Sequence, residues 1–208
     1  MLKIAIPKGR LLEEVSDLFV KSAIIPFKIE ESRKLIVDIS CFRFLIVKPS
    51  DVATYVEQGA ADIGVVGLDV LKEEPKEVYE ILDLKNIGKC SMVVAGKPEK
   101  IEDYKILHFT KVATKYVNIA RSFFEGKDVS INIIKLNGSV EIAPIIGLSD
   151  YIVDITQTGK TLKENGLIVM EKIFDSYAKI ICNKAAFRIK KYDIFKILDK
   201  ILDKLSDI

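Results

Sequence analysis

The sequence predicts an α/β protein with mostly parallel strands arranged in two lobes. Short runs rich in β-branched residues alternate along the chain with segments whose apolar residues recur at helical spacing. A helix followed by a glycine, an aspartate and a buried strand occurs twice, at Gly59 and at Gly147. The repetition indicates two related halves, although ordinary cap and stop signals would produce the same pattern. Because ligands of such folds bind at the carboxyl ends of strands, we expect the site in a cleft between the lobes.

The first lobe is predicted from strand and helix signals along residues 1–94. Its predicted strands are residues 2–7, 35–40, 42–47, 61–66, 77–84 and 89–96. A helix is expected over residues 9–23, where apolar residues recur at helical spacing. We expect Ser50 to cap a second helix over residues 51–58, and Gly59 to end it in the left-handed conformation.

The second lobe is expected over residues 95–172, with the crossover at the Ala95–Pro98 turn. Its predicted strands are residues 106–113, 131–136, 151–155 and 167–174. Its predicted helices are residues 114–126, capped by Thr114, residues 141–146, capped by Ser139, and residues 161–166, ending at Asn165 or Gly166.

The last segment, residues 173–208, is expected to return to the first lobe with a strand at 178–183 and a long helix over 190–208. One face of that helix carries Ile194, Phe195, Leu198, Ile201, Leu202 and Leu205. We expect this face to pack on the first lobe, and a partner-binding helix is the alternative.

Composition excludes several classes of protein. The chain has 208 residues, is 49% hydrophobic and carries a net charge of +2, so disorder and a strong field for nucleic acid or membrane lipid are ruled out. No apolar run is long enough to span a bilayer and no signal peptide is recognised, so we expect a cytoplasmic protein. The three cysteines (Cys41, Cys90 and Cys182) lie in apolar runs and are expected to be buried free thiols, and His108 is expected to be packed in the core.

The most informative motif follows the predicted strand at 151–155. That strand carries Asp154 to its carboxyl end, and the sequence TQTGKT leads into a helix with these residues: Thr156, Gln157, Thr158, Gly159, Lys160 and Thr161. Backbone N–H groups and hydroxyls at such a turn form a phosphate cradle, and the carboxylate suits ribose hydroxyls. The alternative is a connection in which the threonines only cap the helix. The motif lacks the glycine spacing of an ATPase phosphate loop or a dinucleotide fingerprint.

Two further groups of charged residues point to the same chemistry. Lys8 and Arg10 follow the first strand, where they would meet a polyphosphate or, alternatively, only solvent. Glu141 lies in the first turn of a predicted helix, where a plain capping role is the alternative. The same alternative applies to Asp69, while Arg33 and Arg43 fit surface charges on paired strands. These residues predict a two-lobed protein that binds a sugar phosphate, without specifying a reaction.

In order along the chain, these segments resemble the ATP phosphoribosyltransferase family, which opens histidine biosynthesis. The matching segments are IAIPKGRL, PSDVATYVEQGAADIGVVGLDVL, GKCSMVVAG, KVATKYVNIARSFF and LNGSVEIAPIIGLSDYIVDITQTGKTLKENGL. The resemblance covers nearly the whole chain, and the motifs are specific in combination, because their order and spacing match. The TGxTL piece alone also occurs in other phosphoribosyltransferases.

The resemblance implies a fold similar to periplasmic solute-binding proteins, with phosphoribosyl pyrophosphate (PRPP) in the second lobe and ATP across the cleft. Residues 156–161 would hold the 5-phosphate, and Asp154 and Glu141 would hold the ribose hydroxyls. Lys8 and Arg10 would act in catalysis and on ATP, and Arg33 and Asp69 match positions near the nucleotide. Lys48 stands where the family often has arginine, which keeps the charge but removes the two-pronged guanidinium.

The resemblance also implies the reaction and its partners. ATP N1 would attack the anomeric carbon of PRPP, giving N1-(5-phosphoribosyl)-ATP and pyrophosphate, with Mg²⁺ carried by the pyrophosphate and no metal held by the protein. Because the chain resembles the short form of this pentosyltransferase, we expect a regulatory subunit similar to histidyl-tRNA synthetase and a hetero-octamer. The alternatives are a cytoplasmic bilobal solute-binding or sensor domain, and a phosphoribosyltransferase with another acceptor base.

Overall fold

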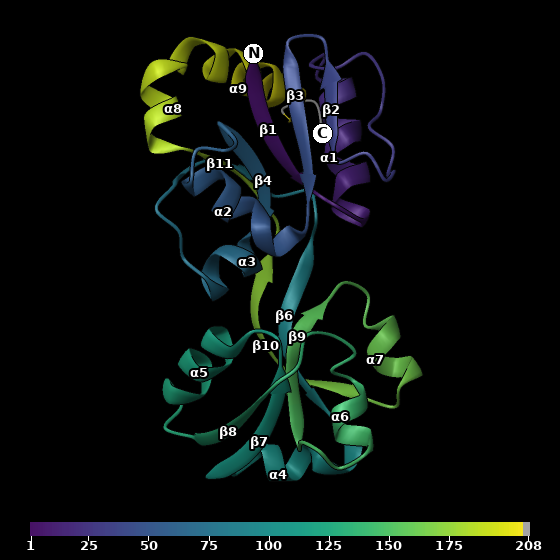
Figure 1. The fold of residues 1–208 in the computed structure, drawn as a ribbon. Coiled ribbons are helices and arrows are strands. Elements are labelled where there is room, and N and C mark those ends of the chain that lie inside the picture. Colours follow the sequence, from purple (N-terminus) through teal and green to yellow (C-terminus); the bar gives the residue numbers. More distant parts are fainter. Residues whose placement is uncertain (206–208) are drawn as a thin grey trace. The chain divides into compact units, whose positions relative to one another are not determined.

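The computed structural model describes residues 1–205, which form two compact α/β units (Figure 1). Unit 1 contains Met1–Leu71, Pro75–Gly88 and the described residues from Tyr177 onward, and unit 2 contains Lys72–Glu74 and Lys89–Ser176. The chain passes between them at 88–89 and 176–177, where we expected 94–95 and 172–173. The difference arises because the strands at 90–96 and 168–176 pair with each other and so belong to one sheet.

Unit 1 is built on a six-stranded sheet in the order β2-β3-β1-β4-β11-β5. The strands are β1 (Leu2–Pro7), β2 (Ile36–Ile39), β3 (Phe42–Val47), β4 (Ile63–Gly67), β5 (Tyr79–Leu84) and β11 (Ala178–Cys182). β1 pairs in parallel with β3 and β4, whereas β2 forms a hairpin with β3 and β11 runs antiparallel to β4 and β5.

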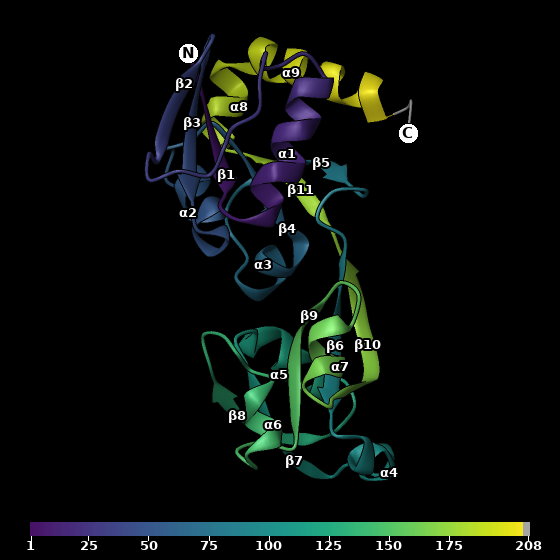
Figure 2. The same cartoon turned by 90° about the vertical axis from the view of Figure 1, so that its right-hand side faces the viewer.

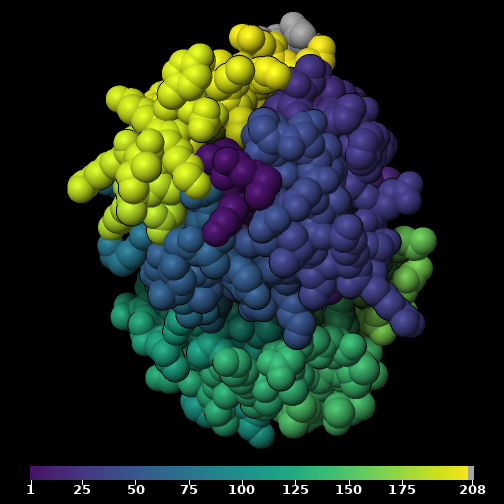
Figure 3. Space-filling model, turned by 45° about the horizontal axis from the view of Figure 1, so that its top comes forward, coloured from purple at the N-terminus to yellow at the C-terminus, as the bar shows by residue number. Residues whose placement is uncertain are grey.

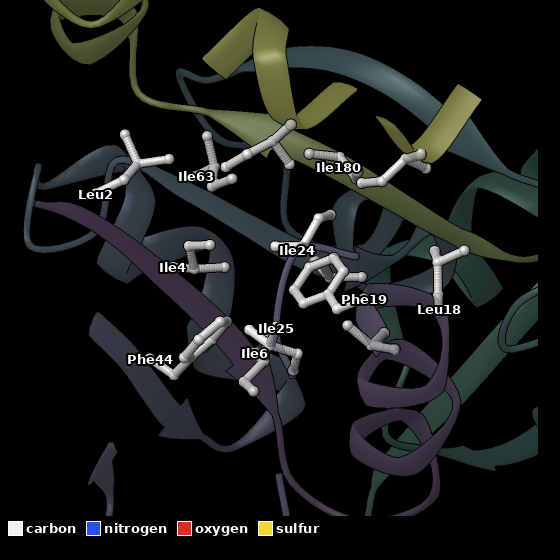
Figure 4. Close-up of a cluster of buried hydrophobic side chains, with 14 of the residues drawn as sticks. Leu2, Ile4, Ile6, Leu18, Phe19, Ile24, Ile25, Phe44, Ile63 and Ile180 are labelled. Carbon is white, nitrogen blue, oxygen red and sulfur yellow. The ribbon is translucent and has the colours of Figure 1, made fainter. Parts of the chain in front are cut away.

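Helices cover both faces of this sheet. α1 (Arg10–Lys21) and α9 (Lys191–Leu205) bury apolar residues in one core with β1, β3 and β11 (Figure 4). The 3₁₀ turn η1 (Pro49–Asp51), α2 (Val52–Glu57) and α3 (Leu68–Glu73) follow β3 and β4, and α2 and α3 contribute to a second core. The short α8 (Lys184–Ile189) precedes α9.

Unit 2 contains a five-stranded sheet in the order β10-β6-β9-β7-β8. Its strands are β6 (Cys90–Gly96), β7 (Phe109–Thr114), β8 (Ser130–Lys135), β9 (Tyr151–Thr156) and β10 (Ile168–Ser176). The 3₁₀ turn η2 (Pro98–Lys100) leads into α4 (Ile101–Lys105), and α5 (Val117–Glu125) shares a core with Tyr104 of α4 and with Leu107. α6 (Ile142–Ile145) and α7 (Lys160–Glu164) share the other core, and Figure 2 shows the same elements from the side.

The predicted α/β class is confirmed, but the sheets are mixed rather than mostly parallel. Parallel pairing needs a crossover connection, and the pairs β1–β3, β1–β4, β7–β8 and β7–β9 have one. The chain reaches β11 of unit 1 directly from unit 2, and it reaches β6 of unit 2 directly from unit 1. Both strands are antiparallel to their neighbours. Sequence reasoning also missed α3, α4 and α8.

Helix ends follow the sequence signals only in part. Gly59 has the expected positive φ of 72°, and Asn165 ends α7 as predicted. The expected cap by Ser50 is wrong, because its hydroxyl donates to the Asp51 carboxylate instead of capping the helix. The cap by Ser139 is also wrong: α6 has no side-chain cap.

In each unit, an aspartate just before a strand makes two hydrogen bonds with the backbone of a lysine on the neighbouring strand. Asp62, before β4, donates its N–H to the Lys3 carbonyl at 2.9 Å and accepts the Lys3 N–H at 2.8 Å. Asp150, before β9, makes the same pair of bonds with Lys111 at 2.9 and 3.0 Å. A helix and a positive-φ glycine precede each aspartate. These shared bonds support the predicted relation between the two halves.

The final helix packs on unit 1 as expected, but with a different set of residues. Ile194, Ile197, Leu198 and Ile201 are buried, whereas Phe195 and Leu202 are 40% and 47% exposed. Figure 3 shows this segment beside the first residues of the chain, and Met1 and Ile197 line one common cavity. The predicted helix extended to Ile208, and residues 206–208 lie outside the described part of the chain.

Two expectations about burial are wrong. Cys41 is exposed at the β2–β3 hairpin and Cys90 is half-buried, so only Cys182 is the buried thiol we expected. Burial raises the pKa of the Cys182 thiol to about 12. His108 is exposed, because β7 begins one residue after it and the segment before β7 lies at the surface. Among the described residues, no helix is long and apolar enough to cross a membrane.

Candidate functional site

The carboxyl ends of three parallel strands in unit 2 bring the second-lobe candidate residues to one edge of a sheet. β7 is the middle strand, and its last residue, Thr114, is paired with Lys135 of β8 and Val153 of β9. Asp154 follows Val153 directly, and Glu141 lies in the connection after β8. Asp154 lies one residue beyond the β7–β9 pairing, but it remains inside β9, where it pairs with Val93 of β6, rather than at the end of the strand as predicted.

The loop after β9 has an open backbone and several hydroxyl groups. Thr156 Oγ1 accepts the Gly159 N–H at 3.1 Å, which closes a tight turn. Gly159 has φ 73°, and a Cβ there would meet no atom within 4 Å, so the space beside it is open. Thr158 and Thr161 are exposed, and the Asp154 carboxylate accepts the Ile155 N–H at 2.8 Å. The loop can thus approach an anionic ligand with backbone and hydroxyl donors.

Glu141 and the β9–α7 loop lie toward the same face of the sheet. Val140, next to Glu141, and Leu162, next to Thr161, are buried in one core cluster with Ala143 and Ile152. Figure 1 shows α6 and α7 on the side of the sheet away from α5. Glu141 is half-buried at the N-terminal end of α6. Asp154 therefore lies next to the last β7–β9 pair, and Glu141 lies in the connection that leaves β8 on the other side of β7.

The turn between β7 and α5 contains contacts that sequence reasoning assigned wrongly or missed. Thr114 was expected to cap the helix, but α5 begins at Val117 and its amides are capped by Glu73. The Glu73 carboxylate accepts the N–H groups of Asn118 and Ile119 at 3.0 Å. Thr114 instead accepts the Tyr116 N–H at 2.8 Å and donates to the Val153 carbonyl at 2.6 Å. No local pattern links Glu73 to a helix that begins more than forty residues later in the chain.

Unit 1 gathers its candidate residues at the corresponding edge of its own sheet. Lys8 follows β1, and its N–H donates to the Val47 carbonyl at the end of β3, next to Lys48. Gly9 has φ 79° and leads directly into α1 with Arg10 at its start. Asp69 follows β4, is only 7% exposed, and lies against Gly67, where a Cβ would come within 2.3 Å of its Oδ1.

A cavity of about 440 Å³ opens beside Arg10 in unit 1. Arg10, Ser16, Lys28 and Glu30 are among the residues that line it. Arg10 also forms an ion pair with Glu14 at 3.3 Å. The cavity is large enough for part of a nucleotide, and its lining offers both cations and acceptors.

The arginines differ in their surroundings. Leu35 accepts the Ile46 N–H at 2.8 Å, so Arg33, two residues earlier, lies just past the carboxyl end of β3. It is exposed and lies before β2, outside the paired strands. Arg43 instead forms a two-pronged bond with Asp38 at 2.8 Å, which lowers the pKa of that carboxyl, so Arg43 is a surface charge as expected.

Comparison with known proteins agrees with this arrangement. The family described as HisG, ATP phosphoribosyltransferase, matches residues 48–206. An ATP phosphoribosyltransferase of Hydrogenobaculum sp. (strain Y04AAS1) is 92% identical over 203 residues, covering 98% of this chain and 100% of the relative. The ATP phosphoribosyltransferase of Aquifex aeolicus (strain VF5) is 52% identical over 207 residues, covering 100% of this chain and 96% of the relative.

Solved structures give the same assignment. The ATP phosphoribosyl transferase (HisG:HisZ) complex from Thermotoga maritima has a chain with TM-score 0.82 and 36% identity, and each chain covers 100% of the other. The Bordetella pertussis BvgS VFT2 domain has TM-score 0.60 at 11% identity, covering 97% of this chain and 86% of that one, which shows a shared fold alone. The predicted two-lobed, periplasmic-binding-protein-like class is therefore confirmed. By its family match, its relatives and its fold, the chain belongs to the ATP phosphoribosyltransferase family.

Proposed function

We propose that the chain binds the phosphoribosyl donor of its reaction, PRPP, at the carboxyl edge of β7, β8 and β9. What supports the proposal is that Asp154 and the open β9–α7 loop follow the last β7–β9 pair, and that the connection after β8 carries Glu141 toward the same face of the sheet. Backbone N–H groups and the hydroxyls of Thr156, Thr158 and Thr161 suit the 5-phosphate, with Gln157, Gly159 and Lys160 completing the loop. The two carboxylates accept hydrogen bonds from the ribose hydroxyls.

The acceptor, ATP, is assigned to the edge of unit 1. Lys8 and Arg10 provide cations for its triphosphate, and Arg33 lies past the same strand ends. Asp69 offers a carboxylate that could accept a hydrogen bond from the adenine amino group or a ribose hydroxyl. The cavity beside Arg10 is where part of the nucleotide fits.

The reaction requires little acid–base chemistry from the side chains. ATP N1 forms a bond to the anomeric carbon of PRPP as the bond to pyrophosphate breaks, and the pyrophosphate leaves with the electron pair. Because N1 carries no proton at neutral pH, no general base is needed for attack. What the protein must supply is orientation of two anionic substrates and cations near the leaving group. Lys8 and Arg10 are assigned the second task, and residues 154–161 the first.

We also infer that Mg²⁺ enters with the pyrophosphate group of PRPP. Among residues 1–205, no group of three or more His, Cys, Asp or Glu side chains is arranged to hold a metal ion. A metal borne by the substrate needs no such group, because phosphate oxygens and water are its preferred ligands. Bound there, Mg²⁺ would neutralise charge on the leaving pyrophosphate.

The first test is direct detection of the product. The chain is incubated with ATP, PRPP and Mg²⁺, with and without a HisZ-type regulatory subunit, and the products are analysed by mass spectrometry. We expect an ATP adduct heavier by one phosphoribosyl group. Absence of the adduct from folded, partner-bound protein would contradict the assignment and favour another acceptor base or a sensor without catalysis.

A second test addresses the donor site. Thr161→Val removes one hydroxyl and should weaken PRPP binding by about 1 kcal/mol, while Asp154→Asn should weaken it without unfolding the chain. Thr54→Val, which changes an exposed threonine on α2 of unit 1, is the control and should leave PRPP affinity unchanged. Calorimetric titration gives the affinities, and parental PRPP affinity in Thr161→Val or Asp154→Asn would show that the pocket is misplaced.

We further propose that the chain acts with a regulatory subunit of the HisZ type, as a hetero-octamer, in the cytoplasm. The support is the likeness to the chain in the Thermotoga maritima HisG:HisZ complex. Native mass spectrometry of the co-expressed subunits should give a particle with four copies of each. A chain that remains alone with the subunit present would contradict the proposed assembly, and fractionation of cells would test the location.

A further inference from the structure

One buried hydroxyl in unit 2 connects the segments that leave the proposed donor edge. The side chain of Thr114 is fully buried, at 0% exposure. Its Oγ1 donates to the Val153 carbonyl at 2.6 Å and accepts the Tyr116 N–H at 2.8 Å. It therefore ties β9, at the residue before Asp154, to the turn that follows β7.

The backbone of the same residue ties down the third connection. The Thr114 carbonyl accepts the N–H of Leu136, the first residue after β8, at 3.0 Å. Leu136 opens the connection that carries Glu141. Thr114 thus contacts the segments that follow β7 and β8 and the last residue of β9 that pairs with β7, although it carries no charge and is closed off from solvent.

Thr110, near the opposite end of β7, is a comparable buried threonine that lies away from the proposed donor site. Thr110 is 2% exposed, and its Oγ1 donates to the Asp150 carboxylate at 3.2 Å, before β9 begins. Both threonines lie on β7 and both bridge to the β9 side, at the two ends of the strand pair. Only the bond of Thr114 lies next to Asp154. Comparing variants at the two threonines therefore distinguishes an effect on the stability of the strands from an effect on the geometry of the site.

We propose that Thr114 is a positioning residue for phosphoribosyl transfer, which holds β9 at Val153 so that the adjacent Asp154 meets the ribose of PRPP. The inference rests on the proposed donor site. Small displacements of positioning groups reduce rates steeply, because orientation of the reactants supplies much of the catalysis. A hydroxyl with one donor and one acceptor bond fixes two backbone segments at once, which an apolar side chain of the same shape cannot do.

The test compares Thr114→Val, Thr114→Ser and Thr110→Val in the full chain with its regulatory subunit. Thr114→Val should raise the dissociation constant and the KM of PRPP about tenfold, with the KM of ATP unchanged. Thr114→Ser keeps the hydroxyl and should bind PRPP like the parent. Thr110→Val should lower the unfolding temperature but keep PRPP affinity, because it breaks the bond at the far end of β7.

The outcomes separate this inference from the donor-site assignment. Unchanged PRPP affinity in folded Thr114→Val, with Asp154→Asn impaired, overturns the role of Thr114 but keeps the donor site. Equal loss of PRPP and ATP affinity in Thr114→Val and Thr110→Val shows a purely structural role and also overturns it. If Asp154→Asn binds PRPP normally, both proposals fail. Should Thr114→Val not fold, Thr114→Ala, which also lacks the hydroxyl, replaces it with the same criteria.

Discussion

Glu73 illustrates how a single side chain at the end of one helix can stabilise another. Its carboxylate accepts the N–H groups of Asn118 and Ile119 in the first turn of α5, and its carbonyl accepts the side-chain amide of Asn118 at 2.9 Å. The first amides of a helix have no partner within the helix, and a negative charge there interacts favourably with the helix dipole. Glu73 supplies both the acceptor and the charge.

Replacing Glu73 should therefore destabilise the protein. Glu73→Ala is expected to lower the free energy of unfolding by about 1–2 kcal/mol, measured by urea denaturation. Glu125→Ala changes the same residue type at the other end of α5, where a negative charge is unfavourable, and should have little effect or stabilise. Equal losses in the two variants would exclude a capping role for Glu73.

The positions of single residues could be predicted from the sequence where they follow from the residue's own strand. Lys8 was placed correctly after its strand, and Asp154 on the strand next to β7, because a strand of known direction carries its last residues to a known edge. Prediction failed where a partner lies far along the chain, as with Glu73, or where several local partners compete. The Ser50 hydroxyl donates to the neighbouring Asp51 carboxylate, and the Thr114 hydroxyl donates to the Val153 carbonyl of β9, so neither caps a helix.

The helix α9 shows what an amphipathic pattern predicts and what it leaves open. The helical period indicates a buried face that was expected to include Phe195 and Leu202, whereas Ile197 is buried in their place. Both faces of this helix carry apolar residues, so periodicity alone did not determine the rotation of the helix about its axis. Burial in the core that α9 shares with α1, β1 and β11 determines it.

Two adjacent residues of α9 provide a sharp test of that orientation. Ile201 is 0% exposed and Leu202 is 47% exposed. Ile201→Ala should cost about 3 kcal/mol of unfolding free energy through lost burial and a cavity, and Leu202→Ala less than about 1 kcal/mol. Urea denaturation of the two variants measures both values. A larger loss for Leu202→Ala would mean that the helix is rotated.

A second prediction concerns the elements around β10. Glu171 on β10 accepts hydrogen bonds from Tyr104 of α4 and from Lys127, which follows α5, both at 2.7 Å. Burial alone would raise the pKa of Glu171, but these two bonds outweigh it and hold the pKa below its usual value. The bonds stabilise the folded state above the unfolded pKa, and this contribution is lost as pH falls through the lower, folded pKa.

The unfolding free energy of the parent should therefore decrease between about pH 6 and pH 3, in part through Glu171. Glu171→Gln should be less stable than the parent at neutral pH and lose less stability on acidification. Glu102→Gln, at an exposed ion pair with Lys105, is the control and should follow the parent. Parallel pH curves for the parent and Glu171→Gln would contradict the prediction.

At the scale of the whole molecule, the two units differ in how the chain builds them. Apart from residues 72–74, unit 2 is one continuous segment, whereas unit 1 is assembled from separate segments of the chain. Both apolar cores of unit 2 among the described residues are drawn from positions 92–174. Two lobes and the return of the chain to the first are predicted from the sequence, but the crossings were expected inside β6 and β10, since strand pairing between distant segments has no local signal.

Residues 89–176 should therefore fold as an isolated segment. We expect circular dichroism to show a cooperative melt at a lower temperature than in the full chain, because the segment lacks the Glu73 cap of α5. A disordered spectrum at all temperatures would show that unit 2 depends on further contacts. The same segment with Leu162→Ala, which opens a cavity in the core beside α7, serves as the destabilised reference.

The position of β11 between β4 and β5 has a consequence for synthesis of the protein. A ribosome completes unit 2 before it has translated β11, an inner strand of unit 1. Until then β4 and β5 lack the neighbour that joins them, and the core of unit 1 also lacks α9. The second half of the chain should thus become protease-resistant first during translation, and the first half should await its final segment, exposed to chaperones in the meantime.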